Sequence, residues 1–391
     1  MDRTVLPGDW RGLVVVCAGT PWDAARMPDQ HLADGLARDH PVLFVDPPTA
    51  LWTRHRQPEA AEALQRPRLR LIRPGLARLT PVVPPGPGRP LLGRVADVML
   101  RRHLRRATAA LGGDVAAVIA CYARPVFGAC GEHRAVYYMT DDLVAGAELL
   151  GQDPIALRRS VTAQSRAADV VVVASEELRE LMHECRKPVV LVPNGVGDVL
   201  LSEPRSVPPS DVTLPRPIAG FVGHLSNRIE PELLAQVAGQ GASLLLVGPR
   251  QTTVDDARLA AVLRMPNVQW VGPKPYGELG AYLDVMDVGL VPYGDNAFNR
   301  ASFPLKTLEY LARGKAVVAT DLPAVRWLNS PLVSVASSPS AFGSAVRQAL
   351  QNPREDLARE RRVFAAQHTW SKRVDAFNCL LRGPLPSAPG A

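Results

Sequence analysis

The sequence predicts an α/β protein built from two successive domains, each with a parallel sheet covered by helices. Short β-branched runs alternate with longer helical stretches along the chain, which is typical of a parallel sheet. A length of 391 residues suits two domains, and 47% apolar with 21% charged residues suits folded cores. A proline-rich break at 197–217 divides the alternation into two halves, so we expect the domain linker there.

The first half contains strand-like runs that are rich in valine and other β-branched residues. These runs lie at 13–18, 41–46, 115–121, 135–139, 169–175 and 188–193. Helical patterns fall near 24–38, 91–112, 154–167 and 175–184. Between 73 and 90 proline and glycine are too frequent for either element, so we expect an irregular loop.

The alternation restarts after the linker, with strand-like runs at 217–223, 242–248, 267–272, 287–293 and 315–320. Helical periodicity then extends to the C-terminal region, and we expect a last helix from Trp370 to pack back on the first domain. The predicted organisation is a first domain at 1–200, a second at 201–368, and the returning helix with a tail at 369–391. Because ligands bind at the carboxyl ends of parallel strands, we expect function in a cleft between the two domains.

Composition and patterning exclude several classes of protein. The net charge of +7 suits an anionic partner, but no basic stripe with interleaved aromatics is present, so we expect no nucleic-acid partner. Five cysteines, none in a CxxC pair, argue against a disulfide framework and against a zinc site. The N-terminal residues lack a signal pattern, and no apolar run reaches the roughly 18 to 20 residues of a membrane span. We therefore expect a cytoplasmic location, with peripheral contact to the inner face of the cell membrane as a further expectation.

The densest motif is FNRASFPLKTLEYLARGKAVVATDLP at 298–323. Pro304 marks the start of a helix, with Ser302 or Phe303 as its cap. The amides of the first turn of a helix lack intrahelical acceptors and bind anions such as a diphosphate. This helix start is therefore a candidate phosphate site.

Two charged residues of the same motif extend this candidate site. Lys306 adds a positive charge in the first turn, and Glu309 lies three residues later on the same helix face. A carboxylate there can accept two hydrogen bonds from the vicinal hydroxyls of a ribose. The alternative is that Lys306 and Glu309 form a solvated pair on a surface helix.

Two further loops follow strands of the second half. In GFVGHLSNR, Gly223 allows a close approach of the backbone to a ligand, His224 follows it, and Arg228 can reach a phosphate. The pattern is neither GxGxxG nor a P-loop, so it is weak by itself. In NVQWVGPKPYGEL the backbone on either side of Lys274 can face a flat base, and the alternative is an ordinary connecting loop.

These motifs resemble the nucleotide-binding domain of GT-B glycosyltransferases, in particular the group related to the retaining family-four (glycosyl transferases group 1) enzymes that act on cell-surface polysaccharides of the teichuronic acid type. The motifs VGH…NR, NVxxVG, DVGLVPY and PLKxxEYLAxGKxVVAT occur in this order within 217–325. The first domain resembles the family more loosely, through PWD, VLFVDPP, ADVVVVASEEL and VPNGV. The resemblance implies a GT-B fold with two Rossmann-like domains, a nucleotide-diphosphate sugar as donor substrate, and no cofactor.

The resemblance also implies roles for individual residues. Glu309 becomes the ribose-binding carboxylate, the amides from Phe303 to Lys306 hold the diphosphate, and Arg228 is the basic partner of the leaving phosphate. The full set of expected donor-binding residues is Gly223, His224, Arg228, Lys274, Ser302, Phe303, Pro304, Leu305, Lys306 and Glu309.

One position departs from the family pattern. The E-x(7)-E motif of the family would place its first glutamate at 301, where this sequence has Ala301. The contact of that glutamate with the donor sugar is therefore missing, or is supplied by Asn299 or Arg300. No D-x-D triplet occurs in the chain, so we expect no metal and a diphosphate neutralised by Arg228, Lys306 and helix amides.

Candidate acceptor and catalytic residues lie in the first domain. Asp141 and Asp142 follow a buried-strand pattern, and either can bind or deprotonate an acceptor hydroxyl; the alternative is a pair that caps a helix. Thr20 and Trp22 follow the first strand, and the Trp22 ring can stack on a sugar. His31, in the next helical stretch, is a candidate catalytic base or a structural histidine.

A basic amphipathic helix is predicted at 91–112. It carries five arginines among apolar residues: Arg94, Arg101, Arg102, Arg105 and Arg106. Such a helix can lie on an anionic membrane surface, where a lipid-linked acceptor would be presented. The alternative is a core-facing helix whose arginines are solvated.

Together these features predict a glycosyltransferase that moves a sugar from a nucleotide-diphosphate donor to a hydroxyl acceptor. The acceptor is a glycan, a lipid-linked intermediate or a natural product, and the family resemblance implies retention of configuration. Two alternatives remain at this point: a sugar-nucleotide epimerase of the same fold, and a non-catalytic binding protein in glycan assembly.

Overall fold

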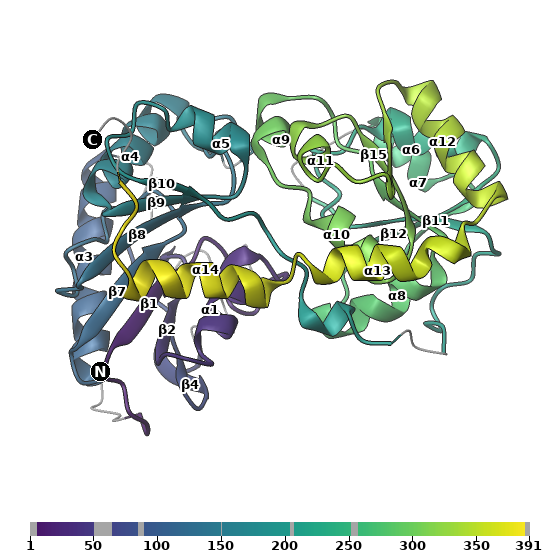
Figure 1. Cartoon of the computed structure of the whole chain (residues 1–391). Coiled ribbons are helices and arrows are strands. Elements are labelled where there is room, and N and C mark those ends of the chain that lie inside the picture. Colours follow the sequence, from purple (N-terminus) through teal and green to yellow (C-terminus); the bar gives the residue numbers. More distant parts are fainter. Residues whose placement is uncertain are drawn as a thin grey trace. The chain divides into compact units, whose positions relative to one another are not determined.

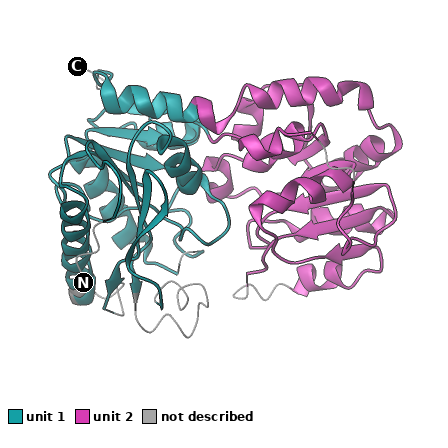
Figure 2. Cartoon of the chain, turned by 90° about the horizontal axis from the view of Figure 1, so that it is seen from below, with its two compact units in different colours: residues 1–193, 373–391 teal, residues 194–372 magenta. Residues whose placement is uncertain are grey.

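The computed structural model of the chain describes residues 6–50, 65–84, 90–149, 151–203, 207–251 and 257–387. Residues 85–89 of the predicted loop, 204–206 of the predicted linker and 388–391 of the tail lie outside the described residues. The chain forms two compact units, residues 1–193 with 373–391, and residues 194–372 (Figure 2). Each unit contains a largely parallel sheet with helices, which confirms the predicted fold class.

The first unit contains a sheet of eight strands. They are β1 (Leu13–Cys17), β2 (Val42–Val45), β4 (Leu69–Arg73), β5 (Leu76–Leu79), β7 (Val115–Ala120), β8 (Arg134–Met139), β9 (Val170–Val173) and β10 (Val189–Leu191). Their order is β10-β9-β8-β7-β1-β2-β5-β4, and only β4 and β5 pair antiparallel (Figure 1). Two short strands, β3 (Thr49–Ala50) and β6 (Val82–Val83), form a separate parallel pair. Strands β1, β2 and β9 are buried throughout, as expected for a parallel sheet covered on both faces.

The predicted loop at 73–90 is wrong over its first half, because this segment contains β5 and β6. Gly75 has φ +76°, and this conformation reverses the chain between β4 and β5. All four residues of β5 are buried in the sheet. The prolines at 81 and 84 flank β6 and do not interrupt a strand. A high proline frequency was therefore a misleading signal for an irregular loop here.

Among the described residues, five α-helices belong mainly to the first unit: α1 (Pro28–Leu36), α3 (Pro90–Ala110), α4 (Pro154–Ala167), α5 (Glu176–Leu181) and the terminal helix α14 (Trp370–Arg382). Helix α14 lies beside α1 (Figure 1), and a Cβ at Gly35 of α1 would overlap the Val374 side chain. The ring of Phe377 also meets Tyr138 of β8 edge-on, with ring centroids 5.1 Å apart. The predicted return of the last helix to the first domain is therefore confirmed.

The second unit contains a sheet of six parallel strands. They are β11 (Ile218–Val222), β12 (Ser243–Val247), β13 (Val268–Trp270), β14 (Val288–Val291), β15 (Ala316–Thr320) and β16 (Val333–Ala336), in the order β13-β12-β11-β14-β15-β16. Its α-helices are α6 (Pro231–Gly239), α7 (Ala257–Leu263), α8 (Leu279–Val285), α9 (Ala297–Ala301), α10 (Leu305–Ala312), α11 (Pro323–Trp327), α12 (Pro339–Gln351) and α13 (Ala358–Ala366). Three short 3₁₀ helices complete it: η2 (Asp198–Leu200), η3 (Tyr276–Glu278) and η4 (Glu355–Leu357).

The described residues of the segment predicted as a linker lie within the second unit. Arg313 donates hydrogen bonds to the carbonyls of Leu200 and Ser202, at 3.3 and 2.6 Å, and so holds the η2 segment. Val196 pairs with the segment that precedes α14, because the Trp370 amide donates to its carbonyl at 3.0 Å. These contacts fix the start of the second unit to its own body.

Each sheet has one point where the chain changes direction across the sheet. This switch point lies between β1 and β7 in the first unit, and between β11 and β14 in the second. Ligands of doubly wound sheets bind outside the carboxyl ends of the strands at such a point. We call the loops at these ends the first-unit edge (18–23, 46–48, 121–125 and 140–146) and the second-unit edge (223–230, 248–251, 271–275 and 292–305).

Candidate functional site

Glycines follow three neighbouring strands along the second-unit edge. Gly223, Gly248 and Gly272 follow β11, β12 and β13, and the Gly248 amide donates to the Gly272 carbonyl at 2.8 Å. Gly248 has φ +137°, and a Cβ there would overlap the carbonyl oxygen of Gly223. Larger residues cannot occupy this position without moving the loop, so glycine at 248 lets the loops after β11 and β12 pack main chain against main chain.

Helix α10 begins beside these glycines. It starts at Leu305, with Pro304 at the N-cap position and no side-chain cap. The predicted cap at Ser302 is wrong, because Ser302 ends α9 and its hydroxyl donates to the Phe298 carbonyl at 2.9 Å. The Leu305 amide donates to the Phe303 carbonyl at 2.9 Å. The first turn of α10 is thus shaped by main-chain contacts around the proline.

The start of α10 is held at the switch point by Tyr310. Its hydroxyl accepts a hydrogen bond from the Val222 amide, at the end of β11, at 2.9 Å. The Tyr310 ring fills the space above Gly289 of β14, where a Cβ would overlap the ring. One buried tyrosine therefore fixes the helix against both strands that flank the switch point.

Lys306 and Glu309 form an ion pair at this start, with Nζ 2.9 Å from Oε2. The Glu309 side chain is 2% exposed and the Lys306 side chain 20% exposed. The alternative of a solvated surface pair is therefore wrong. A buried carboxylate is normally paired or fully hydrogen-bonded, so Lys306 offsets part of the cost of burying Glu309.

His224 adds a third titratable group to the second-unit edge. Partial loss of hydration, together with the charges of Lys306 and Arg228, lowers the pKa of His224 below its ordinary value. His224 is therefore neutral at neutral pH, and a bound anion would favour its protonated form. Both cations therefore oppose protonation of His224 in the absence of a bound anion.

Arg228 is held by residues that follow β14. Its Nε donates to Asn299 Oδ1 at 3.0 Å, and its guanidinium carbon lies 4.8 Å from the Tyr293 ring centroid and 4.9 Å from that of Phe298. Arg300 instead pairs with the exposed Asp295, at 2.6 Å. Asn299 and Arg300, the expected substitutes for the missing glutamate at 301, thus both have other partners.

Lys274 lies at the edge strand of the sheet and has a partner of its own. Its Nζ is 2.5 Å from Asp211 Oδ2 and lies 5.2 Å from the Tyr282 ring centroid. The hydrogen bond with Asp211 raises the pKa of Lys274 above its ordinary value. Asp211, in the segment that precedes β11, was not among the predicted site residues.

Buried carboxylates hold the loop after β1 at the first-unit edge. The Thr20 amide donates to Asp29 Oδ2, and the Trp22 amide donates to Asp46 Oδ1, both at 3.0 Å. Burial raises the pKa of Asp29 to about 6, although main-chain amides that donate to it act in the opposite direction. Thr20 and Trp22 themselves remain partly exposed, so their positions are fixed while their side chains stay accessible.

Arg78 of β5 completes this support. Its side chain is 2% exposed, with Nε 2.8 Å from Asp46 Oδ2 and Nη1 2.6 Å from Asp23 Oδ2. The arginine therefore links the end of β2 to the end of the Thr20–Asp23 loop. The sequence offered a signal for Asp46, which ends a strand-like run, but none for Arg78, which lay in the predicted irregular loop.

The predicted catalytic residues of the first unit have different surroundings. Asp142 Oδ1 accepts from the amides of Val144 and Ala145, at 2.9 and 3.0 Å, so this carboxylate caps a turn. Asp141 accepts from the Thr140 hydroxyl at 3.2 Å at the carboxyl end of β8. His31 lies in the first turn of α1 and is 6% exposed. The two aspartates are thus both partly buried, and Asp142 is the one whose carboxylate caps a turn.

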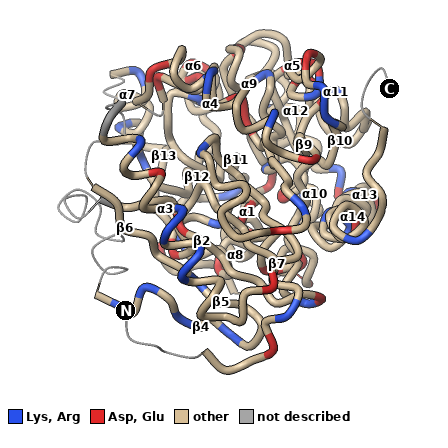
Figure 3. Tube along the Cα trace, turned by 90° about the vertical axis from the view of Figure 1, so that its left-hand side faces the viewer, with Lys and Arg blue, Asp and Glu red and all other residues tan. Residues whose placement is uncertain are grey.

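Helix α3 buries one face and exposes another. Ala96, Leu100 and Leu104 are buried, whereas Val95 is 47% and Val98 66% exposed. Figure 3 marks the basic positions along this helix in blue. These arginines form two groups. Arg101 and Arg105 donate hydrogen bonds to main-chain carbonyls of the 125–129 loop. The other three are exposed: Arg94, Arg102 and Arg106.

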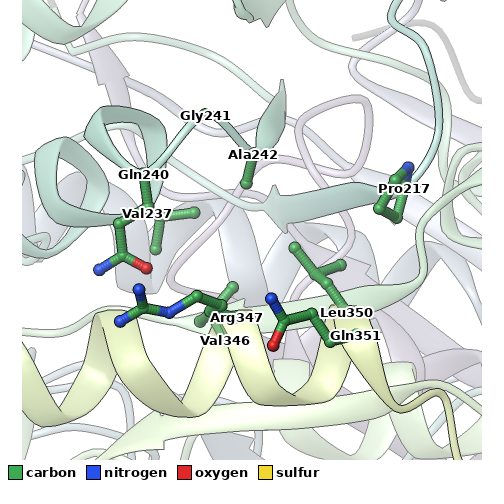
Figure 4. A pocket seen from close by; sticks show the side chains of 9 residues that line it. All are labelled: Pro217, Val237, Gln240, Gly241, Ala242, Val346, Arg347, Leu350 and Gln351. Atoms are coloured by element: carbon green, nitrogen blue, oxygen red, sulfur yellow. The ribbon is translucent and has the colours of Figure 1, made fainter.

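A surface cavity of about 180 Å³ lies at the opposite edge of the second sheet (Figure 4). Its lining includes Pro217 and Ala242, which precede β11 and β12 and therefore mark the amino ends of these strands. It is not part of the second-unit edge. Within the described ranges, no helix is long and apolar enough to cross a membrane, and no group of three His, Cys, Asp or Glu residues is arranged to hold a metal ion.

One comparison with known proteins covers the region that contains the second-unit edge. The family described as "Glycosyl transferases group 1" matches residues 216–352, which include Arg228, Lys306 and Glu309. The putative teichuronic acid biosynthesis glycosyltransferase TuaH of Bacillus subtilis is 32% identical over 227 residues, which is 55% of this chain and 55% of TuaH. The match thus spans about half the length of that relative.

Solved structures share the architecture of the whole chain. Sucrose-phosphate synthase from Thermosynechococcus elongatus has a TM-score of 0.74 at 17% identity, over 95% of this chain and 98% of that one. HepE of Anabaena, in complex with UDP and glucose, has a TM-score of 0.65 at 14% identity, over 94% of this chain and 98% of that one. The chain therefore has the GT-B fold, and residues 216–352 of its second unit are similar to the glycosyl transferases group 1 family.

Proposed function

We propose that this protein is a glycosyltransferase that moves a sugar from a UDP-sugar to a hydroxyl acceptor. The observation that carries the proposal is that Arg228 follows β11 while the Lys306–Glu309 ion pair follows β14, the two strands that flank the switch point of the second sheet. This is the location at which doubly wound sheets bind their ligands. The choice of UDP is supported by the structural likeness to HepE, which was solved with UDP and glucose.

Each of these residues has a role in the proposed donor site. Glu309 binds the ribose hydroxyls, while Arg228, Lys306 and the positive end of the α10 dipole bind the diphosphate. During transfer a bond forms between the acceptor oxygen and the anomeric carbon, and the bond from that carbon to the phosphate oxygen breaks. The leaving UDP keeps the electron pair, and the cations stabilise its developing charge in place of a divalent ion. Retention of configuration is the course that the family implies.

The acceptor is proposed to bind at the first-unit edge. Trp22 offers a partly exposed ring for a sugar, and Thr20 offers a hydroxyl, on a loop fixed by Asp29 and Asp46. Asp141 is the candidate that binds the acceptor hydroxyl or takes its proton, since Asp142 caps a turn. The name of the TuaH relative supports a cell-surface polysaccharide or its lipid-linked intermediate as acceptor.

A lipid-linked acceptor would require access to a membrane surface. We propose that α3 provides it through exposed Val95 and Val98, flanked by exposed Arg94, Arg102 and Arg106. Apolar side chains beside arginines suit the boundary of an anionic bilayer. The protein would then act at the cytoplasmic face of the cell membrane.

A donor screen tests the proposed function. UDP-sugars should raise the melting temperature of the full chain more than GDP- or ADP-sugars do, because a ligand stabilises the state that it binds. Free UDP should then appear slowly with the correct donor alone, and faster when a membrane extract supplies the acceptor. Conversion of one UDP-sugar into another without acceptor would indicate the epimerase, and binding without any turnover would indicate a non-catalytic protein. Either outcome would contradict the proposal.

A further inference from the structure

We infer that Asn299 is a positioning residue that holds the Arg228 guanidinium ready for a two-point contact with the donor diphosphate. The inference rests on the proposed function, because it assigns a device to the same site. As a positioning residue, Asn299 does not itself touch the donor. The sequence had suggested instead that Asn299 contacts the donor sugar.

The Arg228 guanidinium is fixed through one nitrogen and through its ring contacts. Nε donates to Asn299 Oδ1 at 3.0 Å, and the guanidinium lies over both Tyr293 and Phe298 within 5 Å of their centroids. Its two Nη groups make no hydrogen bond with any residue that the structure describes. A planar guanidinium held at Nε leaves an Nη edge that matches two oxygens of a phosphate. The unpaired part of the group is therefore the part that a diphosphate needs.

The Asn299 side chain binds both the guanidinium and the main chain of Arg228. Asn299 Nδ2 donates to the main-chain carbonyl of Arg228 and to that of Gly294, both at 2.9 Å, while Oδ1 accepts from Nε. Asn299 is 1% exposed, so all three bonds are shielded from water. Buried amides are costly unless they are satisfied, and here each satisfying bond also fixes Arg228 or its neighbouring loop.

Helix α9 acts as the support for this arrangement. Its first turn is capped by Asn296, whose side chain accepts from the Asn299 amide at 2.9 Å. The helix presents Phe298 and Asn299, two successive residues, to the same guanidinium, and Ala301 closes it as a buried small residue. A five-residue helix thus joins the loop after β14 to the loop after β11 across the switch point.

Lys306, the other cation of the site, already has a carboxylate partner. Lys306 is already paired with Glu309, whereas Arg228 has no carboxylate partner among the described residues. The orientation of Arg228 should therefore matter for phosphate binding more than its charge alone does. Lysine at 228 could reproduce the charge but not the Nε contact or the planar contact with the rings.

A double-mutant cycle with UDP as the probe tests the inference. Isothermal titration of the full chain should show that Asn299→Ala and Arg228→Gln each weaken UDP binding about 10-fold or more. The double variant should bind UDP no more weakly than Arg228→Gln alone, because Asn299 acts through Arg228. The UDP to UMP affinity ratio should fall in Asn299→Ala, a change that a purely structural role would not cause. Arg300→Gln, on the same helix, is the matched control and should bind UDP as the wild type does.

Two outcomes would overturn the inference. Additive losses in the double variant would show that Asn299 acts independently of Arg228. A lowered melting temperature in Asn299→Ala with unchanged UDP affinity would reduce Asn299 to a structural residue. If the alanine variant does not fold, the isosteric Asn299→Asp replaces it in the cycle. The same weakening of UDP binding is expected, because the introduced carboxylate would neutralise the Arg228 guanidinium. Absence of UDP binding by the wild type would contradict the proposed function itself, which separates the two failures.

Discussion

The two edges of this protein share a topology but use their arginines in opposite ways. Arg78 at the first-unit edge is buried and fully paired, with Asp46 on one side and Asp23 on the other. Arg228 at the second-unit edge is held by an amide and two rings, and it has no carboxylate partner in the described parts of the chain. An arginine neutralised by carboxylates supports a loop, whereas an arginine fixed by neutral groups keeps its charge for a ligand.

The difference explains how one sheet design serves two kinds of ligand. Carboxylates at the first-unit edge, such as Asp29 and Asp46, accept from main-chain amides and shape the loop that we propose binds a neutral hydroxyl acceptor. At the second-unit edge the charge of Arg228 has only neutral partners among the described residues, which suits the proposed diphosphate. Topology thus places both sites, while the partners of a few charged side chains decide what each can bind.

The largest expected effect comes from breaking the support at the first-unit edge. Arg78→Met should leave Asp46 buried without its ion partner, and removal of one partner of a buried pair typically costs about 3–5 kcal/mol of stability. Calorimetry of the full chain should show a lower unfolding temperature for one transition, with UDP binding retained. Arg228→Gln is the matched control, because it should abolish tight UDP binding with little change in stability. An Arg78→Met variant as stable as the wild type would mean that the ion pairs of Arg78 do not support the first-unit edge.

The next effect concerns the ribose contact at the second-unit edge. Glu309→Gln should weaken UDP binding about 10- to 100-fold, the cost of losing hydrogen bonds to a charged acceptor. Pyrophosphate has no ribose, and the variant frees Lys306 from its ion pair, so pyrophosphate should bind at least as well as before. Titration calorimetry with both ligands checks this. An equal loss for UDP and pyrophosphate would show that Glu309 only maintains the structure of α10.

A pH effect of intermediate size is expected from Asp29. Burial raises its carboxyl pKa in the folded protein from the ordinary value of 3.8 to about 6, so the folded state binds the proton more tightly than the unfolded state. This contribution to stability is complete below the unfolded pKa and is lost as pH rises through 6. Between pH 5 and pH 7.5 the loss should amount to about 1.4 kcal/mol. Chemical denaturation of wild type and Asp29→Asn at both values checks it, since the variant should lack this part of the pH dependence. Parallel curves would show that Asp29 has an ordinary pKa.

The smallest effect tests the membrane surface of α3. Arg102→Gln and Arg106→Gln should each lower binding to anionic vesicles about fivefold, which corresponds to about 1 kcal/mol per arginine. Arg101→Gln is the control, since Arg101 donates to carbonyls of its own unit and should change vesicle binding less. Vesicle sedimentation at low and high salt provides the measurement. Binding that is independent of all three arginines would remove α3 from the proposed membrane contact.

The sequence predicted the alternating architecture and the second-unit edge well. Periodicity located most strands within one or two residues, because a buried parallel strand is a continuous apolar run. Helix punctuation placed the start of α10 at Pro304, one residue before Leu305. The spacing of Lys306 and Glu309 also predicted their contact, although not the burial of Glu309, which depends on residues packed from other elements.

The sequence could not predict contacts between distant segments. Asn299 appeared as a candidate sugar contact, yet its partners lie 71 residues away at Arg228. Arg78 and Asp46 are 32 residues apart and meet only because β5 pairs with β2. Strand β5 itself was missed because Gly75 and nearby prolines dominate the local composition, while its pairing partner decides its structure. Such partners follow from sheet order, which periodicity does not specify.

The most direct test of the different roles of the two edges is amide hydrogen exchange of the full chain with and without saturating UDP. UDP should slow exchange in 223–230 and 302–310, the loop of Arg228 and the start of α10, while exchange in 19–23 stays unchanged. This result would place the diphosphate at the edge whose arginine keeps its charge unpaired. Protection confined to the first unit, or unchanged exchange in both second-unit segments, would contradict the assignment of the donor site.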